Sequence, residues 1–538
     1  MLSTPPISVS VPALRGSSST VSSQPSASHS LLAPTDSTER ASSSQSSSQD
    51  GAPLSTSTAV VAPEAVVAPQ RKRPELNAQT NLCNHLAREY GTGLADAVVD
   101  AVNRKGEVSG LDHPTQARLE LHPAVNSRMA SLLAQPNSPV ALGEDGLPRL
   151  VDRARSAEVL VELASALPKD PSGVNCALLI DGANDDRLSF GVKQGNYIDA
   201  ISSAVMFAGS ARQVSHGDRD TLDFLQSKSI VWTLQTSPLG LAGAQWADVR
   251  EVHSLVEPAL EAPLSASFAS RNYELFAPGD ASNQGIAGFS ELQKRAYLIT
   301  RGEFSPTCQA EETFSLPEGF NWPAQASLKI DEAVLRVAEA FVSSLGDSAR
   351  VEMGKMYIGG EKTGLTREDA LKICADLSLV LSAVAKTDNG LDAGGPFGTV
   401  VWNPENGGVT VGKNQVVPSK APCNHGERTG LFLHPEDHAA REVVITSAEP
   451  CSMCYLACDE RDMDVAFVVT SEGVENNTPF KEGKKNWAEF SGEAMGPKAC
   501  LDEAGTSVIN GKSWLASRAE LGAQILNAWT HNGEDYSV

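Results

Sequence analysis

Three side chains that bind metal ions well stand at a fixed spacing in the last third of the chain. Cys451 and Cys454 follow a strand-like stretch at 443–446, and His425 precedes them. Two thiolates and one imidazole are good zinc ligands, and three protein ligands leave the fourth position to water. If Pro450 starts a helix, both sulfurs face one point beside the end of the strand. The fold must therefore bring His425 to the same end of this strand.

An acidic residue accompanies these ligands. Glu427 lies two residues after His425 and is not needed to hold the metal, so it is free to move protons beside the open position. Both residues stand where another helix is expected to start. His434 and His438 are alternative ligands, but neither has a glutamate two positions on, and His438 leaves too few residues before Pro450 for a helix end and a strand. We therefore predict His425 as the ligand and Glu427 as the catalytic residue.

A purely structural zinc site is the main alternative for this cluster. Such a site normally has four protein ligands, and Cys423 and Cys458 are near enough in the sequence to supply the fourth. Cys458 follows Cys454 by one helical turn, although a buried free cysteine usually packs as a small hydrophobic side chain. The intact Glu427 favours a catalytic site, because a glutamate adds nothing to a structural one.

The pattern H-x-E followed by P-C-x-x-C resembles the signature of zinc-dependent nucleobase deaminases. Around it, the stretches GGPFGTVV at 394–401 and VGKNQVV at 411–417 are similar in order and spacing to the guanine deaminase and tRNA adenosine deaminase branch of the cytidine deaminase superfamily. The resemblance covers about 365–475. It implies a bound Zn2+, an Asn414 that contacts the substrate and a Phe397 that helps to wall the base pocket.

The sequence departs from this family's pattern close to the motif. Gly426 precedes Glu427 where alanine is usual, and Pro435 predicts that the helix after Glu427 is brief. The two substrate contacts also have simpler explanations. An asparagine in a turn often caps its own loop, which would account for Asn414, and Phe397 is equally suited to the hydrophobic core.

The resemblance implies a hydrolytic deaminase, which replaces an exocyclic amine of a ring by a carbonyl and releases ammonia. The expected substrate is a nucleobase, nucleoside or nucleotide, with a purine such as guanine or adenine first and cytosine second. The alternative is a secreted effector that uses the fold as a protein-interaction scaffold, with a vestigial or structural zinc site.

The overall charge bears on the kind of substrate. The 538 residues carry a formal net charge of −23, whereas a protein that grips long nucleic acid usually shows a basic face. A small-molecule substrate is therefore favoured over RNA. No apolar run approaches the roughly 18 to 20 residues of a membrane span. The nine cysteines form no regular framework, which indicates reduced thiols and a cytoplasmic location.

Residues 1–75 are rich in Ser, Pro, Thr and Ala and hold no Phe, Tyr or Trp. Such a segment cannot bury enough surface to offset the entropy of ordering, so we expect it to be disordered. It resembles the N-termini of bacterial type III secreted effectors, which would place the protein in a host cell. An organellar transit peptide and a plain tail are the alternatives.

Strands and helices alternate along the rest of the chain, which predicts an α/β fold. Thr366 is the expected N-cap of one helix, with an acidic residue, Asp369, at its N3 position. We expect helices at 149–166, 198–208, 333–345 and 366–385, and strands at 174–180, 229–234, 397–402, 409–411, 442–447 and 465–469.

The order of strands and helices at 76–315 is repeated at 316–538. We therefore expect a duplicated cytidine-deaminase-like mixed sheet sandwiched by helices, with a first copy that has lost its zinc ligands and a catalytic second copy. Such a first copy would replace the partner subunit with which related enzymes wall their pockets; an oligomer is the alternative.

An overlay of the two copies can be anchored on a shared proline, Pro238 in the first copy and Pro450 in the second. Leu239 and Ala242 then take the places of the two cysteines. Asp199 falls near the place of the catalytic glutamate. In this overlay no zinc ligand survives in the first copy.

Overall fold

The computed structural model describes most of the chain beyond residue 73. Contacts within the chain divide it into two units, residues 1–69 and 70–538, and the described residues all lie in the second. Residues 1–73 of the expected N-terminal segment thus lie outside them. The described residues are 74–103, 116–195, 198–216, 228–257, 274–280, 286, 288–304, 316–329, 332–352, 354–360, 363–389, 397–434, 442–461, 463–469, 518, 520–522 and 524–525.

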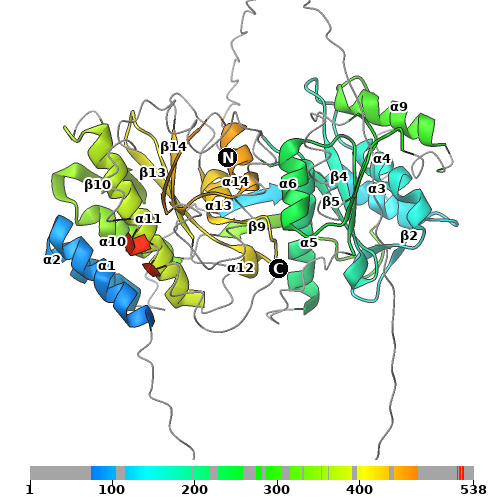
Figure 1. Cartoon of the computed structure of the whole chain (residues 1–538). Helices are drawn as coiled ribbons and strands as arrows, with labels where there is room; N and C mark the ends of the chain where they lie inside the picture. Colours follow the sequence, from blue (N-terminus) through cyan, green and yellow to red (C-terminus); the bar gives the residue numbers. More distant parts are fainter. Residues whose placement is uncertain are drawn as a thin grey trace, which may run out of the picture. The chain divides into compact units, whose positions relative to one another are not determined.

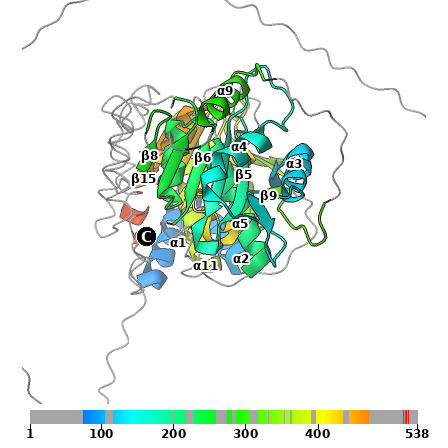
Figure 2. The same ribbon diagram turned by 90° about the vertical axis from the view of Figure 1, so that its right-hand side faces the viewer.

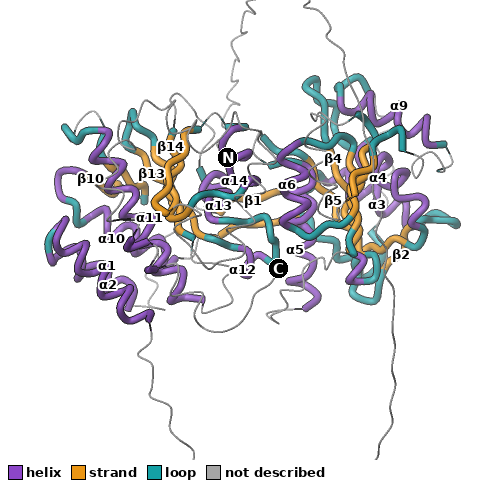
Figure 3. Tube along the Cα trace, in the orientation of Figure 1, coloured by secondary structure: helices purple, strands orange, loops and turns teal. Residues whose placement is uncertain are grey.

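A six-stranded mixed sheet forms the centre of the second half (Figures 1 and 3). Only β14 and β15 are parallel; the other neighbours are antiparallel. β12 and β14 are buried along their whole length, which is why their apolar residues run on instead of alternating. In order across the sheet the strands are β10 (Ala349–Glu352), β11 (Lys355–Ile358), β13 (Gly408–Lys413), β12 (Gly398–Trp402), β14 (Val443–Ala448) and β15 (Asp464–Val469).

Helices cover both faces of this sheet (Figure 1). On one face, four helices share a single hydrophobic core with it: α1 (Pro74–Tyr90), α2 (Thr92–Asn103), α10 (Glu332–Ser343) and α11 (Arg367–Asn389). On the other face lie the short helices α12 (Val416–Ser419), α13 (Gly426–Leu433) and α14 (Ser452–Asp459). The predicted cap of α11 is confirmed, because Thr366 Oγ1 accepts the N–H of Asp369 at 3.1 Å and donates to its carboxylate at 2.7 Å.

A seven-stranded mixed sheet forms the centre of the first half. β6–β7 and β7–β8 are parallel, and the other neighbours are antiparallel. Apart from β8, its strands follow one another in the same order and directions as β10 to β15 do in the other sheet. In order across the sheet they are β2 (Val140–Leu142), β3 (Pro148–Leu150), β5 (Arg187–Val192), β4 (Cys176–Asp181), β6 (Ile230–Thr233), β7 (Glu251–Ser254) and β8 (Glu274–Phe276).

The helices of the first half also lie on two sides of its sheet. α3 (Pro123–Leu133), α4 (Ser156–Ala164) and α9 (Phe289–Thr300) cover the side seen in Figure 2. α5 (Ala200–His216) and α6 (Pro238–Trp246) cover the other side, where α6 contacts α14 and α5 contacts α12. None of the helices in the described part of the chain is both long enough and apolar enough to cross a membrane.

Smaller elements connect these layers. β1 (Gln116–Glu120) and β9 (Gln325–Lys329) form an antiparallel pair that contacts α5 and α13. Short 3-10 helices lie at Arg153–Arg155, Gly182–Asn184 and Gly346–Ser348.

The predicted α/β architecture is confirmed, with two mixed sheets and helices on both faces of each. The helix expected from Arg149 begins only at Ser156, because Arg149 and Leu150 pair in β3. β5 was not predicted. It follows a turn in which Asp185 and Asp186 have φ of 56° and 53°, a left-handed conformation that aspartate adopts more readily than most residues.

Candidate metal centre and active site

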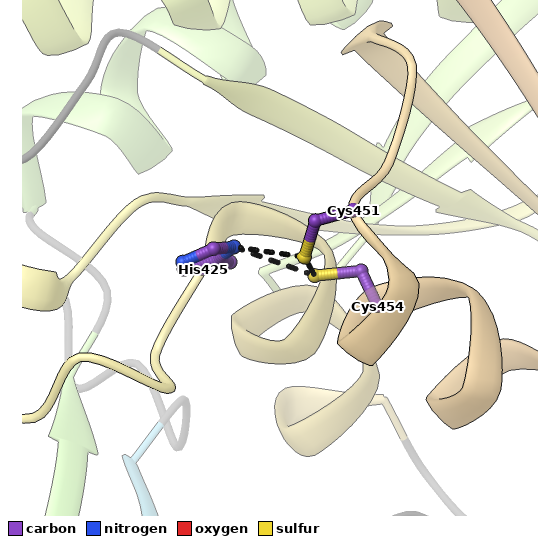
Figure 4. A group of neighbouring side chains, drawn as sticks. All are labelled: His425, Cys451 and Cys454. Atoms are coloured by element: carbon purple, nitrogen blue, oxygen red, sulfur yellow. Dashed lines mark hydrogen bonds between the residues drawn. The ribbon is translucent and has the colours of Figure 1, made fainter. Parts of the chain in front are cut away.

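The three predicted metal ligands meet beside the carboxyl end of β14 (Figure 4). Nδ1 of His425 lies 3.4 Å from Sγ of Cys451 and 3.6 Å from Sγ of Cys454, and the two sulfurs are 3.5 Å apart. In a tetrahedral zinc site, bonds of about 2.0–2.3 Å place the ligand atoms about 3.5–3.8 Å apart. The three atoms therefore have close to the spacing that one zinc ion requires.

Each ligand-bearing segment is the start of a short helix. His425 and Cys451 immediately precede α13 and α14, and both have an extended backbone with ψ of 164° and 168°. Their carbonyls accept the N–H of Thr429 and Tyr455 at 2.9 and 3.0 Å, whereas their side chains make no capping hydrogen bond. The imidazole and the thiol are therefore free to face a metal, and two helix N-termini at the site favour the thiolate form.

The cysteines considered as a fourth ligand do not join this group. Cys423 is buried, and its thiol lies 3.7 Å from the carbonyl oxygen of Ser202 and 3.7 Å from Oδ1 of Asn424. Cys458 is buried one turn beyond Cys454 in α14. Within the described ranges, the only group of three or more potential ligand atoms close enough for one ion is the His-Cys-Cys group, so the arrangement is that of a site with an open position.

His434, one of the two alternative histidine ligands, is not at the site either. Nδ1 of His434 lies 2.8 Å from Oγ1 of Thr410, and its Nε2 lies 2.8 Å from Oε1 of Glu442. These contacts hold its ring at the far end of α13. His438 lies outside the described residues. The helix itself ends at Leu433, which confirms that it is brief.

Glu427 lies in the first turn of α13, buried beside the ligands. Its carboxylate accepts from Sγ of Cys454 at 3.4 Å and from Oγ1 of Thr446 at 3.4 Å. Burial raises the pKa of Glu427, and the negative charge of Cys451 raises it further, while His425 acts in the opposite direction. A carboxyl group whose pKa is raised toward neutrality can both take and give protons, as a general acid–base residue must.

The three ligands also shift the pKa values of one another. Burial by itself would raise the pKa of the Cys451 thiol, but its hydrogen bond with Cys454 and the charge of His425 lower that pKa well below its ordinary value. The pKa of Cys454 is raised, first by burial and then by Cys451. Burial would lower the pKa of His425, yet the Cys451 thiolate raises it. The site thus favours one thiolate, and a metal ion would displace the remaining protons.

The structure brings both predicted substrate contacts to the turn at 425–427. The N–H of Asn414 donates to the carbonyl of Phe397 at 3.1 Å. A Cβ on Gly426 would lie 2.9 Å from that carbonyl oxygen. The side chain of Asn414 accepts the N–H of Val416 at 3.1 Å, so it does cap its own loop, and Phe397 is half-buried against the core. Their contact with a substrate stays a prediction.

Two residues at the site were missed by sequence reasoning. The ring of Trp246, the last residue of α6, meets that of His425 edge-on, with centroids 4.6 Å apart and planes at 79°. Arg428 is buried and donates from Nη1 to Oγ of Ser202 at 2.8 Å. The first half therefore contacts the metal-ligand turn at two places. A charged residue directly after Glu427 was the one signal that could have indicated this.

The fold and the site together define a mixed α/β domain with a His-Cys-Cys metal centre at the starts of two helices. Residues 374–470 match the cytidine and deoxycytidylate deaminase zinc-binding region. The chain therefore contains a zinc-binding region of the deaminase family, as the resemblance over about 365–475 predicted.

Three solved structures are similar to parts of this chain. NE0047 in complex with 2,6-diaminopurine is 21% identical with a TM-score of 0.20, over 31% of this chain and 85% of that one. A mutant of NE0047 in complex with 8-azaguanine is 20% identical with a TM-score of 0.19, over 30% and 85%. A guanine deaminase from Nitrosomonas europaea is 17% identical with a TM-score of 0.18, over 33% and 92%. No curated protein matches the chain.

Proposed function

We propose that this protein is a zinc-dependent hydrolytic deaminase of a nucleobase, nucleoside or nucleotide. The observation that carries the proposal is the buried carboxyl of Glu427 beside the three ligand atoms, 3.4 Å from Sγ of Cys454. Three protein ligands leave the fourth position open, as in catalytic zinc sites. A buried glutamate at that place has no role in holding the metal. The family match at 374–470 supports the same reaction class.

The residues of the site divide the work of this reaction. His425, Cys451 and Cys454 would hold the ion, which when bound lowers the pKa of a water ligand toward neutrality. Glu427 takes one proton from the attacking water and gives it to the ring nitrogen, and then takes the second proton from the hydroxyl on the ring carbon and gives it to the departing amine. A carbon–oxygen bond forms and the carbon–nitrogen bond breaks, so water is consumed and ammonia is released.

A purine such as guanine or adenine is the first proposed substrate, and cytosine in some form is the second. Phe397 and Asn414 are proposed to wall the pocket and to contact the base. The net charge of −23 favours a small molecule over a long nucleic acid, because binding a polyanion requires a basic surface.

Ammonia release over a panel of free bases, nucleosides and nucleotides tests the function, together with zinc content by mass spectrometry. We expect about one zinc per chain and turnover of at least one member of the panel. Glu427→Gln should keep the zinc and lose activity by about 10²- to 10⁴-fold, the usual contribution of a general acid–base residue. Glu460→Gln, at an exposed carboxylate at the far end of α14, is the matched control. A protein without zinc, or a Glu427→Gln variant with full activity, would contradict the proposal.

We also propose that the two halves are copies of one ancestral domain, a metal-free one within 76–315 and a catalytic one within 316–538, with α1 and α2 packed on the sheet of the second. The shared strand order and directions of β2–β7 and β10–β15 support this. So does a pair of glycines at corresponding places. A Cβ on Gly191 in β5 would lie 2.2 Å from the backbone nitrogen of Ala204 in α5. A Cβ on Gly412 in β13 would lie 2.5 Å from that of Gly430 in α13.

The match of Gly191 with Gly412 aligns α5 with α13 residue by residue. Asp199 immediately precedes α5 as His425 immediately precedes α13. Two residues further on, Ile201 stands where Glu427 stands. In the metal-free half a carboxylate thus takes the place of the imidazole ligand, and an aliphatic side chain takes the place of the general acid–base residue.

The places of the cysteines follow from the other helix pair. Ser237 is the N-cap of α6 as Cys451 is the N-cap of α14, and Gly240 stands where Cys454 stands. This register differs from the overlay expected from the sequence, which aligned the two prolines. Pro238 is the first residue of its helix, whereas Pro450 precedes the N-cap, so proline alignment shifts the helices against each other.

A further inference from the structure

We propose that the metal-free half completes the active site. In this proposal Ser202 and Asp199 receive the side chain of Arg428, and this contact positions the catalytic Glu427. Arg428 is then a positioning residue whose partner lies in the other half of the chain. The proposal rests on the proposed function for its kinetic test, but not for its spectroscopic one.

The contact is an unbroken chain of hydrogen bonds between buried groups. Nη1 of Arg428 donates to Oγ of Ser202 at 2.8 Å. The hydroxyl of Ser202 donates in turn to Oδ2 of Asp199 at 2.6 Å, and its backbone N–H donates to Oδ1 at 2.9 Å. Arg428 is 5% exposed and Asp199 is 3% exposed. A buried cation and a buried anion are therefore joined through one hydroxyl.

Because both charges are buried, this contact affects the stability of the arrangement. A charge taken out of water is destabilising unless hydrogen bonds and an opposite charge compensate it. Asp199 receives compensation from the N-terminus of α5 and from the guanidinium beyond Ser202. Arg428 gains a hydroxyl acceptor backed by a carboxylate. Loss of either partner would leave the other charge under-compensated, so the two halves are held to one geometry here.

The register of the helices shows why the two side chains meet. Ser202 is the third residue of α5, and Arg428 is the third residue of α13. The contact therefore joins equivalent positions of the two copies, as at the axis of a two-fold pair. The helices α6 and α14, which are also equivalents, contact each other as well. One copy supplies the cation at this position, and the other supplies the hydroxyl and the anion.

Two glycines of the first half allow the close packing that this contact requires. A Cβ on Gly243 in α6 would lie 2.6 Å from Oγ of Ser202, so only glycine leaves this hydroxyl in place. A Cβ on Gly209 in α5 would lie 2.6 Å from the carbonyl oxygen of Ser419, the last residue of α12. This second close approach brings α5 against the segment that leads into the metal-ligand turn.

The effect on the active site follows from the shortness of α13. Glu427 lies between His425, whose ring meets Trp246, and Arg428, which is held by Ser202. Because a residue on each side of Glu427 is held by the first half, its backbone has little freedom. A shift of a general acid–base group by about 1 Å lowers the rate strongly without releasing the metal or the substrate.

The test compares Arg428→Met, Arg428→Lys, Ser202→Ala, Asp199→Asn and the double variant Ser202→Ala/Arg428→Met. Ser203→Ala is the matched control, because Ser203 is equally buried in α5 but its hydroxyl accepts from Val192 in its own sheet. We expect Ser202→Ala and Arg428→Met to lower kcat about tenfold or more, with KM changed less than about twofold. The double variant should be no worse than Arg428→Met alone, because the two side chains act as one unit. Arg428→Lys should recover part of kcat.

A readout without turnover separates this proposal from the proposed function. Replacing the zinc by Co2+ gives visible absorption bands that report the geometry of the thiolate and imidazole ligands. Ser202→Ala and Arg428→Met should shift these bands and Ser203→Ala should not, even if no substrate in the panel is turned over. Unchanged bands in Arg428→Met, independent effects of the two single variants on kcat, or an equal effect of Ser203→Ala would overturn the proposal.

Discussion

The two halves of this molecule share a strand order and differ at the helix starts that carry the chemistry. In the second half the starts of α13 and α14 present His425, Cys451 and Cys454. In the first half the corresponding starts of α5 and α6 present Asp199 and Ser237, which bond within their own helices. With the same order of strands, the helix starts of the second half thus bring three potential metal ligands together, whereas those of the first half bond within their own helices.

A second comparison concerns the outer helices of the two sheets. In the second half Asp376 in α11 accepts hydrogen bonds from Arg518 and Tyr90 and contacts His85. In the first half Glu162 in α4 pairs with Arg128 of α3 and Arg295 of α9. Each half thus ties distant segments to one carboxylate. The side chain of Asp376 is fully buried, whereas that of Glu162 is 14% exposed. The ion-pair cluster around Asp376, in the second half, is therefore the less solvated of the two clusters, which are called clamps below.

The first comparison predicts that metal binding is lost only by changes in the second half. Cys454→Ser should remove zinc and reduce deamination by more than about 10³-fold, because a serine hydroxyl does not replace a thiolate ligand. Ser237→Ala, at the corresponding helix start of the first half, should leave zinc content unchanged. Mass spectrometry of the purified proteins measures both. Cys458→Ala is a further control: loss of zinc in that variant would mean a four-ligand structural site.

The metal site could be predicted from the sequence because its evidence is local. The spacing of His425, Glu427, Cys451 and Cys454 fixes their places at two helix starts once the strand between them is recognised. The contacts that the first half makes with this site could not be predicted in this way. Which side chains meet Arg428 depends on the packing of α5 against the second half, and no local pattern encodes that packing.

The strands of the two sheets show the same difference between local sequence evidence and long-range packing. Strands such as β12 and β14 are continuous apolar runs and were predicted. β5 and the short edge strands were missed, because their residues are mixed and they are strands only through their partners. The overlay expected from the sequence aligned Pro238 with Pro450, and the proposed register of the two halves differs from it, because Pro238 is the first residue of its helix whereas Pro450 precedes the N-cap.

The second comparison predicts unequal losses of stability. Asp376→Ala leaves the buried Arg518 without its nearest carboxylate, and breaking a buried pair in this way costs about 3–5 kcal/mol. Glu162→Ala should cost less, about 1–3 kcal/mol, because water can reach the arginines left behind. Urea unfolding of the two variants checks this ranking. Equal losses would mean that the two clamps are equally solvated.

The buried clamp also predicts a dependence on acid. Burial by itself would raise the pKa of Asp376, but the hydrogen bond with His85 and the charge and hydrogen bonds of Arg518 outweigh it, and the pKa is lowered. The stabilisation is therefore complete above the unfolded pKa of about 3.9 and is lost as the pH falls below it through the lower folded pKa. Asp376→Asn should reduce stability at pH 7 and flatten its fall between about pH 5 and pH 2. An unchanged slope in urea unfolding against pH would show that other carboxylates dominate.

The smallest expected effect lies in the turn between the ligand and the general acid–base residue. A Cβ on Gly426 would lie 2.9 Å from the carbonyl oxygen of Phe397 and 3.1 Å from Oγ1 of Thr399, although alanine occupies the corresponding Ala200. Gly426→Ala should therefore displace Glu427 and lower kcat by a few-fold, with a stability loss of about 1–3 kcal/mol from overpacking. Ala200→Gly, the reciprocal change, should cost about 0.5–1 kcal/mol through backbone entropy and leave kcat unchanged. A fully active Gly426→Ala variant would show that the turns of the two halves have equal room, and that the glycine is not what this site requires.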